Sequence, residues 1–253
     1  MNNKFVVSVL MMILSIGLIG CSNSSATENS EKTLVMGTSA DFAPFESRNE
    51  SGEIVGFDID LANHIADELG YNLEIKDMKF DGLVGALQTE KVDMVLAGMS
   101  ATEKRSQNVD FSTQYNHSGE MFITNKDANI ESLEQLKGKT VGVQLGTIQE
   151  EGAKKIQEKV DFKIKRVDTS STLIQELKTN RIDVAYMDKA AAKGYIKEQN
   201  LGGFEDPTSS SPGMAVAFPK GSDLKEDVNK VLKEMKESGK LEELKKKWLE
   251  ESK

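Results

Sequence analysis

The sequence predicts an α/β protein, because runs typical of strands and of helices alternate along most of the chain. The segment KTLVMG, residues 32–37, has the apolar character of a strand. The later segment DIDLANHIADELG places Leu61 and Ile65 on one helix face and ends at Gly70, a residue type that commonly stops helices. Residues 92–99, VDMVLAGM, form a nearly continuous apolar run, as expected of a strand buried on both faces. Repeated alternation of this kind predicts mainly parallel sheets.

The remaining predicted elements continue the same order. They are a strand over 72–78, a helix over 81–91, a short helix over 132–138, a strand over 140–144, a helix from Gln149, a strand over 162–167, a helix over 171–179, a strand over 184–187, a strand over 213–222 and two amphipathic helices separated by Gly239. A polar interval at 125–129 separates the apolar runs 92–99 and 140–144. The chain is therefore expected to form two lobes.

Composition narrows the classes of partner. The chain has 253 residues, of which 38% are hydrophobic and 29% charged, as in ordinary globular proteins. Its 32 basic and 41 acidic residues give a net charge of -9. No basic run is interleaved with aromatic residues, so no nucleic-acid partner is expected. Lys245 to Lys247 lie on the outer face of the last helix and are expected to be solvated there.

The N-terminal segment predicts export. Lys4 is followed by residues 5–20, which carry no charge and are too few to span a bilayer, since that takes roughly 20. Cys21 is the only cysteine, which excludes an intrachain disulfide. The sequence LIGC resembles the lipobox of bacterial lipoproteins, which implies a signal peptide over 1–20 and a lipid such as palmitate on Cys21. Residues 21–32 are polar and predict a flexible tether. The alternative is a cysteine placed there by accident.

Unusual side chains gather where predicted strands end. Ligands of open parallel sheets bind beyond the carboxyl ends of the strands. The candidates that follow successive strands are the aromatic loop Phe42–Phe45, Phe80, the segment Ser100–Arg105, the segment Gly146–Gln149, and Asp188. We therefore expect one ligand site at this edge.

Two of these candidates suit opposite charges. Ser100 and Glu103 form a capping-box pattern, which predicts a helix start that attracts anions, and the Arg105 guanidinium suits a carboxylate. Asp188 follows a strand and could pair with a cation. Either pattern taken alone is most often a plain helix cap. If both face one cleft, they match a zwitterion.

Six segments resemble, in order and spacing, the polar amino-acid solute-binding proteins of bacterial ABC importers (family 3). They are GTSADFAPFES, GEIVGFDIDLANHIADELG, LAGMSATEKR, VGVQLGTIQE, RIDVAYMDKAA and AFPKGS, and the resemblance extends from about Thr33 to Trp248. It implies a type II periplasmic-binding-protein-like fold of two lobes, each a mainly parallel sheet with flanking helices. Two hinge strands would join the lobes near Met121–Asn125 and Met214–Phe218.

The resemblance also implies an organisation and partners. Lobe 1 would contain residues 33–120 and 217–253, and lobe 2 residues 121–216. The protein would be an exported monomer anchored outside the membrane, would use no cofactor or metal, and would deliver one free amino acid to an ABC permease. Whether the envelope has one membrane or two stays open.

Carried over by position, the resemblance assigns the groups that hold the ligand backbone. Arg105 and Ser100, with the main chain around Gly98 and Ile148, would bind the α-carboxylate. Asp188, with the Gly98 carbonyl, would bind the α-ammonium. The physics agrees, because a buried charge needs a partner of opposite sign.

The side chain of the ligand is harder to assign. Phe42 and Phe80 would sandwich it, and Asp58 matches a position that supplies an acid in binders of basic amino acids; these three residues favour arginine or another cationic side chain. The alternative is that Asp58 only caps its helix. Ser39 stands where several such binders carry Asp, which weakens the assignment.

Glutamine is the second candidate ligand. Gln144 and Gln149 could pair with a side-chain amide, and Ala97, beside Gly98, is a further candidate pocket residue. We expect arginine first, then lysine or glutamine.

Two other classes of function share the fold. It also hosts periplasmic enzymes, including a dehydratase, and ligand sensors. His64 and His117 lack metal-ligand spacing and come with no nucleophile motif, and the chain ends at Lys253 with no spanning segment after the predicted lobes. A binding protein rather than an enzyme is therefore expected.

Overall fold

The computed structural model describes residues 32–209 and 211–250. The predicted signal peptide, the lipid attachment at Cys21 and the predicted tether up to residue 31 lie outside the described residues. None of the described helices is both long and apolar enough to cross a membrane.

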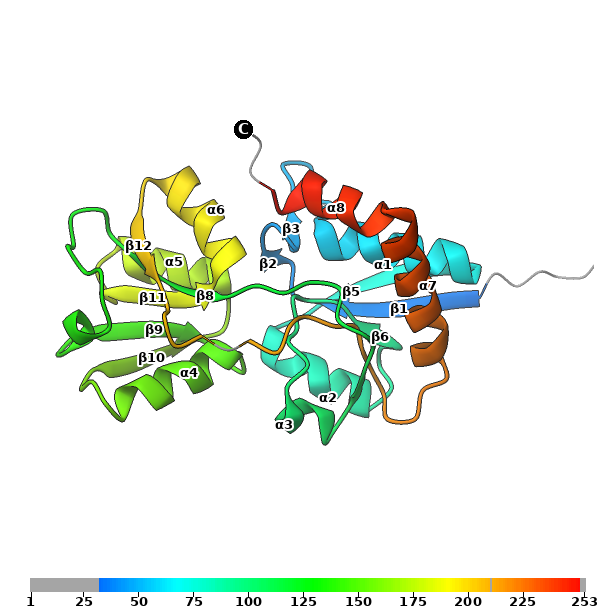
Figure 1. Ribbon diagram of the computed structural model, residues 1–253, viewed down its shortest axis with the longest axis horizontal. Helices are drawn as coiled ribbons and strands as arrows, with labels where there is room; N and C mark the ends of the chain where they lie inside the picture. The colour runs from blue at the N-terminus through cyan, green and yellow to red at the C-terminus, as the bar shows by residue number, and fades with distance from the viewer. Residues whose placement is uncertain (1–31, 210, 251–253) are drawn as a thin grey trace, which may run out of the picture. The chain divides into compact units, whose positions relative to one another are not determined.

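The first lobe is built on a five-stranded sheet of order β5-β1-β6-β13-β7 (Figure 1). Its strands are β1 (Lys32–Thr38), β5 (Tyr71–Asp77), β6 (Met94–Val95), β7 (Asp110–Phe111) and β13 (Ala217–Phe218). The helices beside it are α1 (Phe57–Leu69), α2 (Leu83–Gln88) after the 3-10 turn η1 (Phe80–Gly82), α3 (Glu103–Ser106), α7 (Leu224–Ser238) and α8 (Lys240–Trp248). A small three-stranded sheet of β2 (Asp41–Phe42), β3 (Glu46–Arg48) and β4 (Ile54–Val55) adjoins them. Gly70 ends α1 with φ 71, as predicted.

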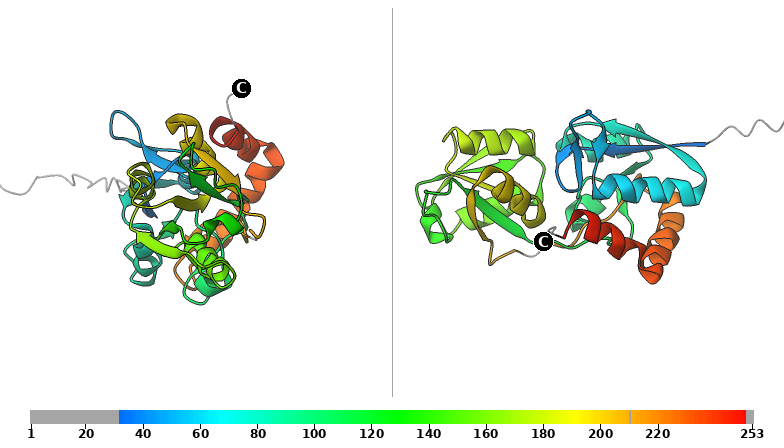
Figure 2. Two further views of the ribbon diagram at one scale, coloured as in Figure 1. Left: turned by 90° about the vertical axis from the view of Figure 1, so that its left-hand side faces the viewer. Right: turned by 90° about the horizontal axis from the view of Figure 1, so that it is seen from above.

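The second lobe is built on another five-stranded sheet, of order β10-β9-β11-β8-β12. Its strands are β8 (Glu120–Thr124), β9 (Thr140–Gln144), β10 (Lys163–Val167), β11 (Val184–Asp188) and β12 (Gly202–Glu205). Its helices are α4 (Ile148–Gln157), α5 (Ser170–Lys178) and α6 (Lys189–Gln199), with a 3-10 turn η2 (Glu134–Leu136). Figure 2 shows the two lobes from two further directions.

Helices cover both faces of each sheet. Successive side chains of a strand point to opposite faces, so both sets are buried. In β1, Leu34 and Met36 pack with α1, α7 and α8, whereas Val35 packs with α2 on the other face. In the second sheet, Val184 lies in the cluster that includes α4, and Ala185 in the cluster that includes α5 and α6. Helices on both faces explain why these strands are apolar throughout.

Each sheet is mixed. The pairs β1–β5, β1–β6, β9–β10 and β9–β11 are parallel. The pairs of β13 with β6 and β7, and of β8 with β11 and β12, are antiparallel. The α/β class and the two lobes are therefore as predicted, while parallel pairing holds for only part of each sheet. The exceptions are strands that lie next to the passages between the lobes.

Those passages lie elsewhere than predicted. Residues 121–124 are part of β8, well inside the second sheet, and the polar interval 125–129 follows β8 within the same lobe. Residues 217–218 form β13 in the first sheet. The described residues 112–119, and 206–209 with 211–213, instead lie between the two sheets and mark where the chain passes from one lobe to the other (Figure 1). A polar interval such as 125–129 occurs wherever a strand ends, within a lobe as well as between lobes. It therefore does not locate the passage between the lobes.

Several predicted elements are shorter in the structure. The helix predicted to begin at Ser100 begins at Glu103, and its N-cap is Thr102, whose side chain accepts from the Arg105 N–H. Ser100 instead forms a β-bridge with Met214. Residues 132–138 contain only η2. The capping-box prediction at Ser100 was therefore wrong, because Thr102, two positions later, is a competing N-cap.

Candidate ligand-binding site

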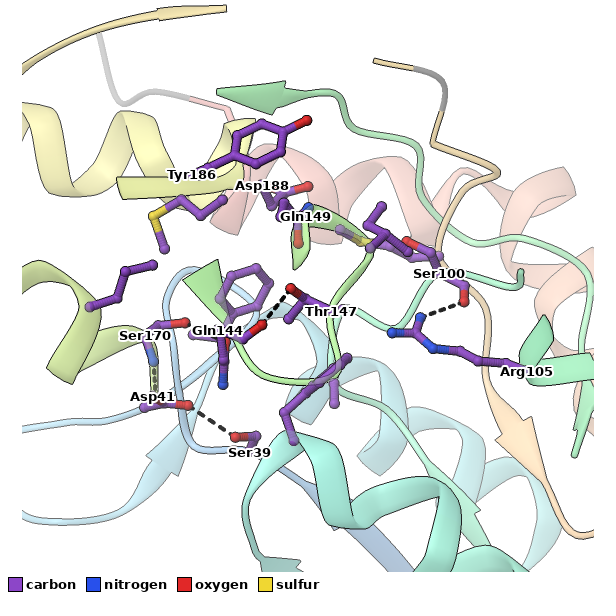
Figure 3. Close-up of a pocket in the computed structure, with 18 residues that line it drawn as sticks. Ser39, Asp41, Ser100, Arg105, Gln144, Thr147, Gln149, Ser170, Tyr186 and Asp188 are labelled. Atoms are coloured by element: carbon purple, nitrogen blue, oxygen red, sulfur yellow. Dashed lines mark hydrogen bonds between the residues drawn. The ribbon is translucent and has the colours of Figure 1, made fainter. Parts of the chain in front are cut away.

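A pocket lies where loops of the first lobe meet the carboxyl ends of β9 and β11 (Figure 3). The space between its lining atoms is about 540 Å³, with the open solvent at its mouth included. Every predicted site residue except Asp58 lines it: Ser39, Phe42, Phe80, Ala97, Gly98, Ser100, Arg105, Gln144, Ile148, Gln149 and Asp188. Thr147, inside the predicted segment Gly146–Gln149, lines it too. The lining residues that sequence reasoning missed are Asp41, Ser170, Leu173, Tyr186, Met187 and Met214.

Arg105 supplies a cation without a carboxylate partner. Its Nη1 donates to the Ser100 carbonyl at 2.7 Å and its Nη2 to the Gly146 carbonyl at 3.0 Å. The guanidinium also lies over the Phe80 ring, 5.3 Å from its centroid. Burial lowers the pKa of Arg105 to about 10, so the group is still charged at neutral pH. No ion pair joins Arg105 to another residue of the described chain, which leaves its charge available to an anion.

The loop before α4 brings a helix N-terminus to the same region. Thr147 caps α4 by accepting from the Glu150 N–H at 3.2 Å, and its own hydroxyl donates to the Gln144 carbonyl at 2.7 Å. Ile148 and Gln149, the first residues of this 10-residue helix, line the pocket. Because the first N–H groups of a helix have no partner within it, this end can donate to an anion.

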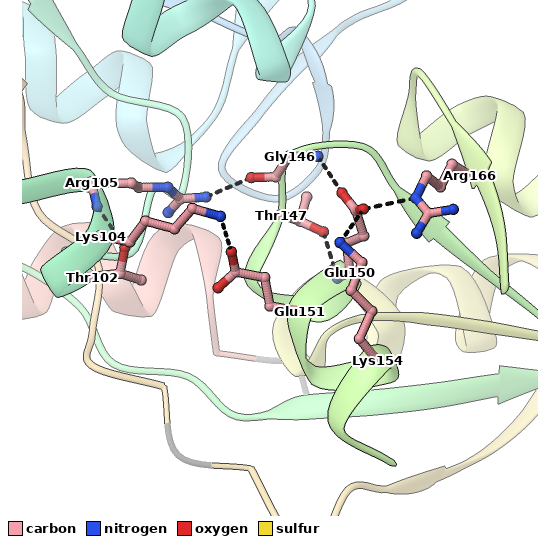
Figure 4. A network of polar contacts seen from close by, with 9 residues as sticks. All are labelled: Thr102, Lys104, Arg105, Gly146, Thr147, Glu150, Glu151, Lys154 and Arg166. Carbon is pink, nitrogen blue, oxygen red and sulfur yellow. Dashed lines mark hydrogen bonds and ion pairs between the residues drawn. The ribbon is translucent and has the colours of Figure 1, made fainter. Parts of the chain in front are cut away.

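The Glu150 side chain holds the loop that contains Gly146 and Thr147 (Figure 4). Its side chain accepts from the Gly146 N–H at 3.0 Å and pairs with Arg166 and Lys154, both at 2.7 Å. Burial alone would raise the pKa of Glu150, but the hydrogen bonds from Arg166, Lys154 and Gly146 outweigh it and lower the pKa to about 2. Glu150 is therefore ionised throughout the neutral range and holds Gly146, whose carbonyl accepts from Arg105.

Asp188 supplies an unpaired anion at the end of β11. Only 6% of the residue is exposed. Its Oδ1 accepts from the Ala190 and Ala191 N–H groups at 2.8 and 3.3 Å, so it caps α6 and also lines the pocket. Burial raises the pKa of Asp188 to about 6. No cation of the described chain pairs with it, and a cationic group in the pocket would compensate its charge.

A second anion lies at another side of the pocket. The Asp41 Oδ1 accepts from the Ser39 hydroxyl at 3.0 Å, and its Oδ2 accepts from the Ser170 N–H, at the start of α5, at 2.6 Å. The Ser170 hydroxyl donates to the Gln144 Oε1 at 2.8 Å. Burial raises the pKa of Asp41 above its ordinary value. Within the described residues no cation pairs with it.

Asp41 could have been found from the sequence. It lies inside the aromatic loop, directly before Phe42 and two residues after Ser39. A carboxylate beside the expected acid position was the available signal.

The aromatic walls come from the first lobe. Phe42 stacks on Phe45 with ring centroids 5.4 Å apart, and it also lies against Gly98. A Cβ at Gly98 would come within 2.8 Å of the Phe42 ring, and Gly98 has φ +56, so glycine is the residue that fits here. Phe80 lines the pocket as well, close to Arg105.

The prediction that Asp58 supplies an acid to the pocket is corrected. Asp58 is fully buried in the first lobe and does not line the pocket. Its Oδ2 accepts from the Gly98 N–H at 2.7 Å and from the Tyr115 hydroxyl at 2.9 Å. It does not cap α1 either, because the N-cap position is Gly56 and has no side-chain cap. Helix orientation, which spacing cannot give, turns the side chain inward.

Two lobes joined by two passages, with a pocket of unpaired charges between loops of both, define the class of two-lobed binding proteins. The chain belongs to the bacterial extracellular solute-binding proteins, family 3, whose profile matches residues 34–251. It is 44% identical over 249 residues to the arginine-binding extracellular protein ArtP of Bacillus subtilis, with 97% of each chain covered.

The chain is also similar to solved structures of amino-acid-binding proteins. An ancestral arginine-binding protein bound to arginine is 42% identical, with a TM-score of 0.82 over 87% of this chain and 99% of that one. A structure of an ancestral arginine-binding protein bound to glutamine is also 42% identical, with a TM-score of 0.83 and the same coverage. The family predicted from the six sequence segments is therefore confirmed.

Proposed function

We propose that this protein binds a free L-amino acid, arginine before lysine or glutamine, and delivers it to an ABC permease. The observation that carries the proposal is the set of unpaired charges in one pocket. Arg105 is a cation without an anion, and Asp188 and Asp41 are anions without cations among the described residues. An amino acid with a cationic side chain brings one anion and two cations, which is the complementary set.

In the proposed pose the ligand backbone lies between Arg105 and Asp188. The α-carboxylate accepts from Arg105, Ser100 and the first N–H groups of α4, as a carboxylate at a helix N-terminus does. The α-ammonium pairs with Asp188, together with the Gly98 carbonyl. These contacts recognise the part that all amino acids share.

The side chain would extend along Phe42 toward Asp41. A guanidinium can stack on aromatic rings and donate to a carboxylate at the same time, which suits this end of the pocket. In this pose Asp41 takes the role first expected of Asp58, two residues from the Ser39 position. The relatives described as arginine-binding proteins support this choice.

Glutamine is the second candidate, favoured by Gln144, which already hydrogen-bonds Ser170 beside Asp41. The structure of an ancestral arginine-binding protein with glutamine bound shows that a protein of this kind can accept an amide. An amide would leave Asp41 without a cation, so we place glutamine after arginine.

Catalysis is not part of the proposal. The relatives are named as binding proteins. One structural neighbour, 36% identical, is described as an ancestral amino-acid-binding protein that is a precursor of cyclohexadienyl dehydratase. No group of metal-binding side chains occurs within residues 32–209 and 211–250.

We further propose export, with a lipid on Cys21 that anchors the monomer to the outer face of the membrane. The extracellular family supports export, and the LIGC motif supports the anchor. For closure we propose the two predicted lobes, first expected as 33–120 with 217–253 and as 121–216, but with the boundaries moved to the two passages. The reason is that Glu120 begins β8 of the second sheet, and Met214 and Val216 pack in the core of the first lobe.

The test is thermal unfolding of the protein from residue 22 onward, refolded to remove bound ligand, with each of the twenty amino acids. A ligand at 100 times its Kd adds about 2.7 kcal/mol to the free energy of unfolding. We expect the largest increase in Tm with arginine. Agmatine, which is arginine without the carboxylate, is the matched control and should give little shift, because Arg105 would stay unpaired. A protein that responds to no amino acid would refute the proposal.

A further inference from the structure

Two fully buried carboxyl groups, Asp58 and Glu46, lie behind the pocket wall. Neither forms an ion pair with a described residue. Asp58 is fixed by two donors, the Gly98 N–H at 2.7 Å and the Tyr115 hydroxyl at 2.9 Å, both on its Oδ2. A buried carboxylate of this kind needs further donors, since an unpaired charge in the interior is strongly unfavourable.

Glu46 supplies the missing donor if it carries a proton. Its Oε1 and Oε2, and the Asp58 Oδ1, have no other donor within the described chain. Burial and the nearby charge of Asp58 raise the pKa of Glu46 well above its usual range. A proton on Glu46 would let it donate to the neighbouring Asp58. With that proton in place, Asp58 would accept from three groups, two of which, Gly98 and Tyr115, bond to it directly.

These three groups belong to separate parts of the site. Gly98 is a pocket residue at φ +56. Glu46 is in β3, where it pairs with Phe42 of β2, another pocket residue. Tyr115 lies in the 112–119 passage between the lobes and stacks on Phe57, with ring centroids 5.8 Å apart.

We propose that Asp58 is a positioning residue for the pocket: it holds the main chain at Gly98 and, through Glu46, the strand that carries Phe42, and so sets ligand affinity without touching the ligand. The inference rests on the proposed function, namely that the pocket binds an amino acid. The physical reason is preorganisation, because a wall fixed before binding loses less freedom when the ligand arrives.

The substitution Asp58→Asn separates this role from direct charge pairing. The Oδ1 of the new amide can still accept from Gly98 and Tyr115, and its Nδ2 can donate to a side-chain carboxyl oxygen of Glu46. A positioning role therefore survives Asp58→Asn. A role in which the negative charge attracts a cationic ligand does not.

The experiment measures Kd by calorimetry, with arginine and glutamine as probes, and the free energy of unfolding without ligand. We expect Asp58→Ala to raise Kd about tenfold or more for each amino acid that the parent binds, since Gly98 loses its acceptor. Asp58→Asn should stay within about threefold of the parent. Asp60→Asn is the matched control: Asp60 lies in the same turn of α1 and accepts from Lys247 and Trp248 at 2.6 and 2.7 Å, away from the pocket. It should lower stability and leave Kd unchanged.

Three outcomes would overturn the inference. One is a folded Asp58→Ala protein that binds with the parent Kd. Another is an Asp58→Asn protein that loses arginine affinity tenfold and keeps glutamine affinity, which would show direct charge pairing. If Asp58→Ala does not fold, Tyr115→Phe decides, because it removes one donor to Asp58 and keeps the ring: a Kd at least about threefold weaker supports the network, and an unchanged Kd refutes it. A parent protein that binds no amino acid refutes the proposed function itself, which is seen before any variant is made.

Discussion

The two ends of the pocket hold their charges in different ways. Arg105 and Asp188 bond to main-chain groups: the carbonyls of Ser100 and Gly146, and the N–H groups that begin α6. At the other end, Asp41 accepts from one main-chain group, the Ser170 N–H, and also from a side chain, the Ser39 hydroxyl, while the Ser170 hydroxyl donates to Gln144. Main-chain partners are set by the fold and do not change with residue type. The first end therefore suits the common part of every amino acid, and the second can alter selectivity by single substitutions.

The largest effect on binding is expected at the end of the pocket formed by Arg105 and Asp188. Arg105→Ala should weaken arginine binding by about 3–5 kcal/mol, because the ligand carboxylate would be buried without its cation. Calorimetric titration measures it. Arg181→Ala is the control, since Arg181 is 60% exposed and pairs at 3.0 Å with Glu176. A titration in which Arg105→Ala binds like the parent would disprove the assignment of this end.

Asp188 should make binding dependent on pH. The pKa of Asp188 is raised to about 6, so below that pH the carboxyl group is mostly protonated. It must then lose its proton before it can pair with the ligand ammonium. Affinity should therefore weaken as the pH falls below about 6, by up to about tenfold per pH unit. The stability of the ligand-free protein changes with pH in the opposite direction to the ligand affinity. Because the folded pKa lies above the ordinary 3.8, the folded state binds more protons in this window and loses stability as the pH rises through it.

Asp188→Asn tests this assignment. The amide oxygen can still cap α6, so the fold should be kept, while affinity at pH 7 falls by about 2–3 kcal/mol. The pH dependence of Kd near 6 should largely disappear. Glu120, which pairs with Asp188 across β8 and β11 and whose pKa burial raises to about 7, is the neighbouring acid that could take its place. A variant that keeps the full pH dependence would assign it to Glu120 instead.

A smaller and more selective effect is expected at Asp41. Asp41→Asn should weaken arginine by about 1–2 kcal/mol and leave glutamine nearly unchanged, because only arginine brings a second cation. Competition between the two ligands in one titration gives the ratio directly. Equal losses for both would mean that Asp41 acts only through its bond to the start of α5.

The smallest effect is expected at Phe80. Phe80→Ala should cost about 1 kcal/mol and broaden the range of amino acids bound, because a stacking surface is lost while every charge pair is kept. Thermal shifts with the full set of amino acids measure the range. Narrower selectivity would show that Phe80 does not contact the ligand side chain.

Much of the fold could be predicted from periodicity. The strands β1, β5 and β9 and the helix α1 lie where apolar spacing placed them, because burial on one face or both leaves a direct pattern in the sequence. The helix predicted to start at Ser100 failed, since Thr102 is an equally good cap and spacing does not rank the two. The positions of the passages between lobes also failed, since a crossing strand and a sheet strand have the same composition.

The site divides in the same way. The sequence by itself indicated the two lobes, through the alternation of strands and helices, and the family, through the six segments. It also singled out Arg105 and Asp188, which line the pocket. Only the tertiary structure decided between Asp58 and Asp41. Both are acids beside pocket motifs, but α1 turns Asp58 into the core, where Gly98 and Tyr115 hold it, while Asp41 meets the start of α5 from the other lobe. Contacts between residues so far apart in the chain depend on packing, and no local spacing records them.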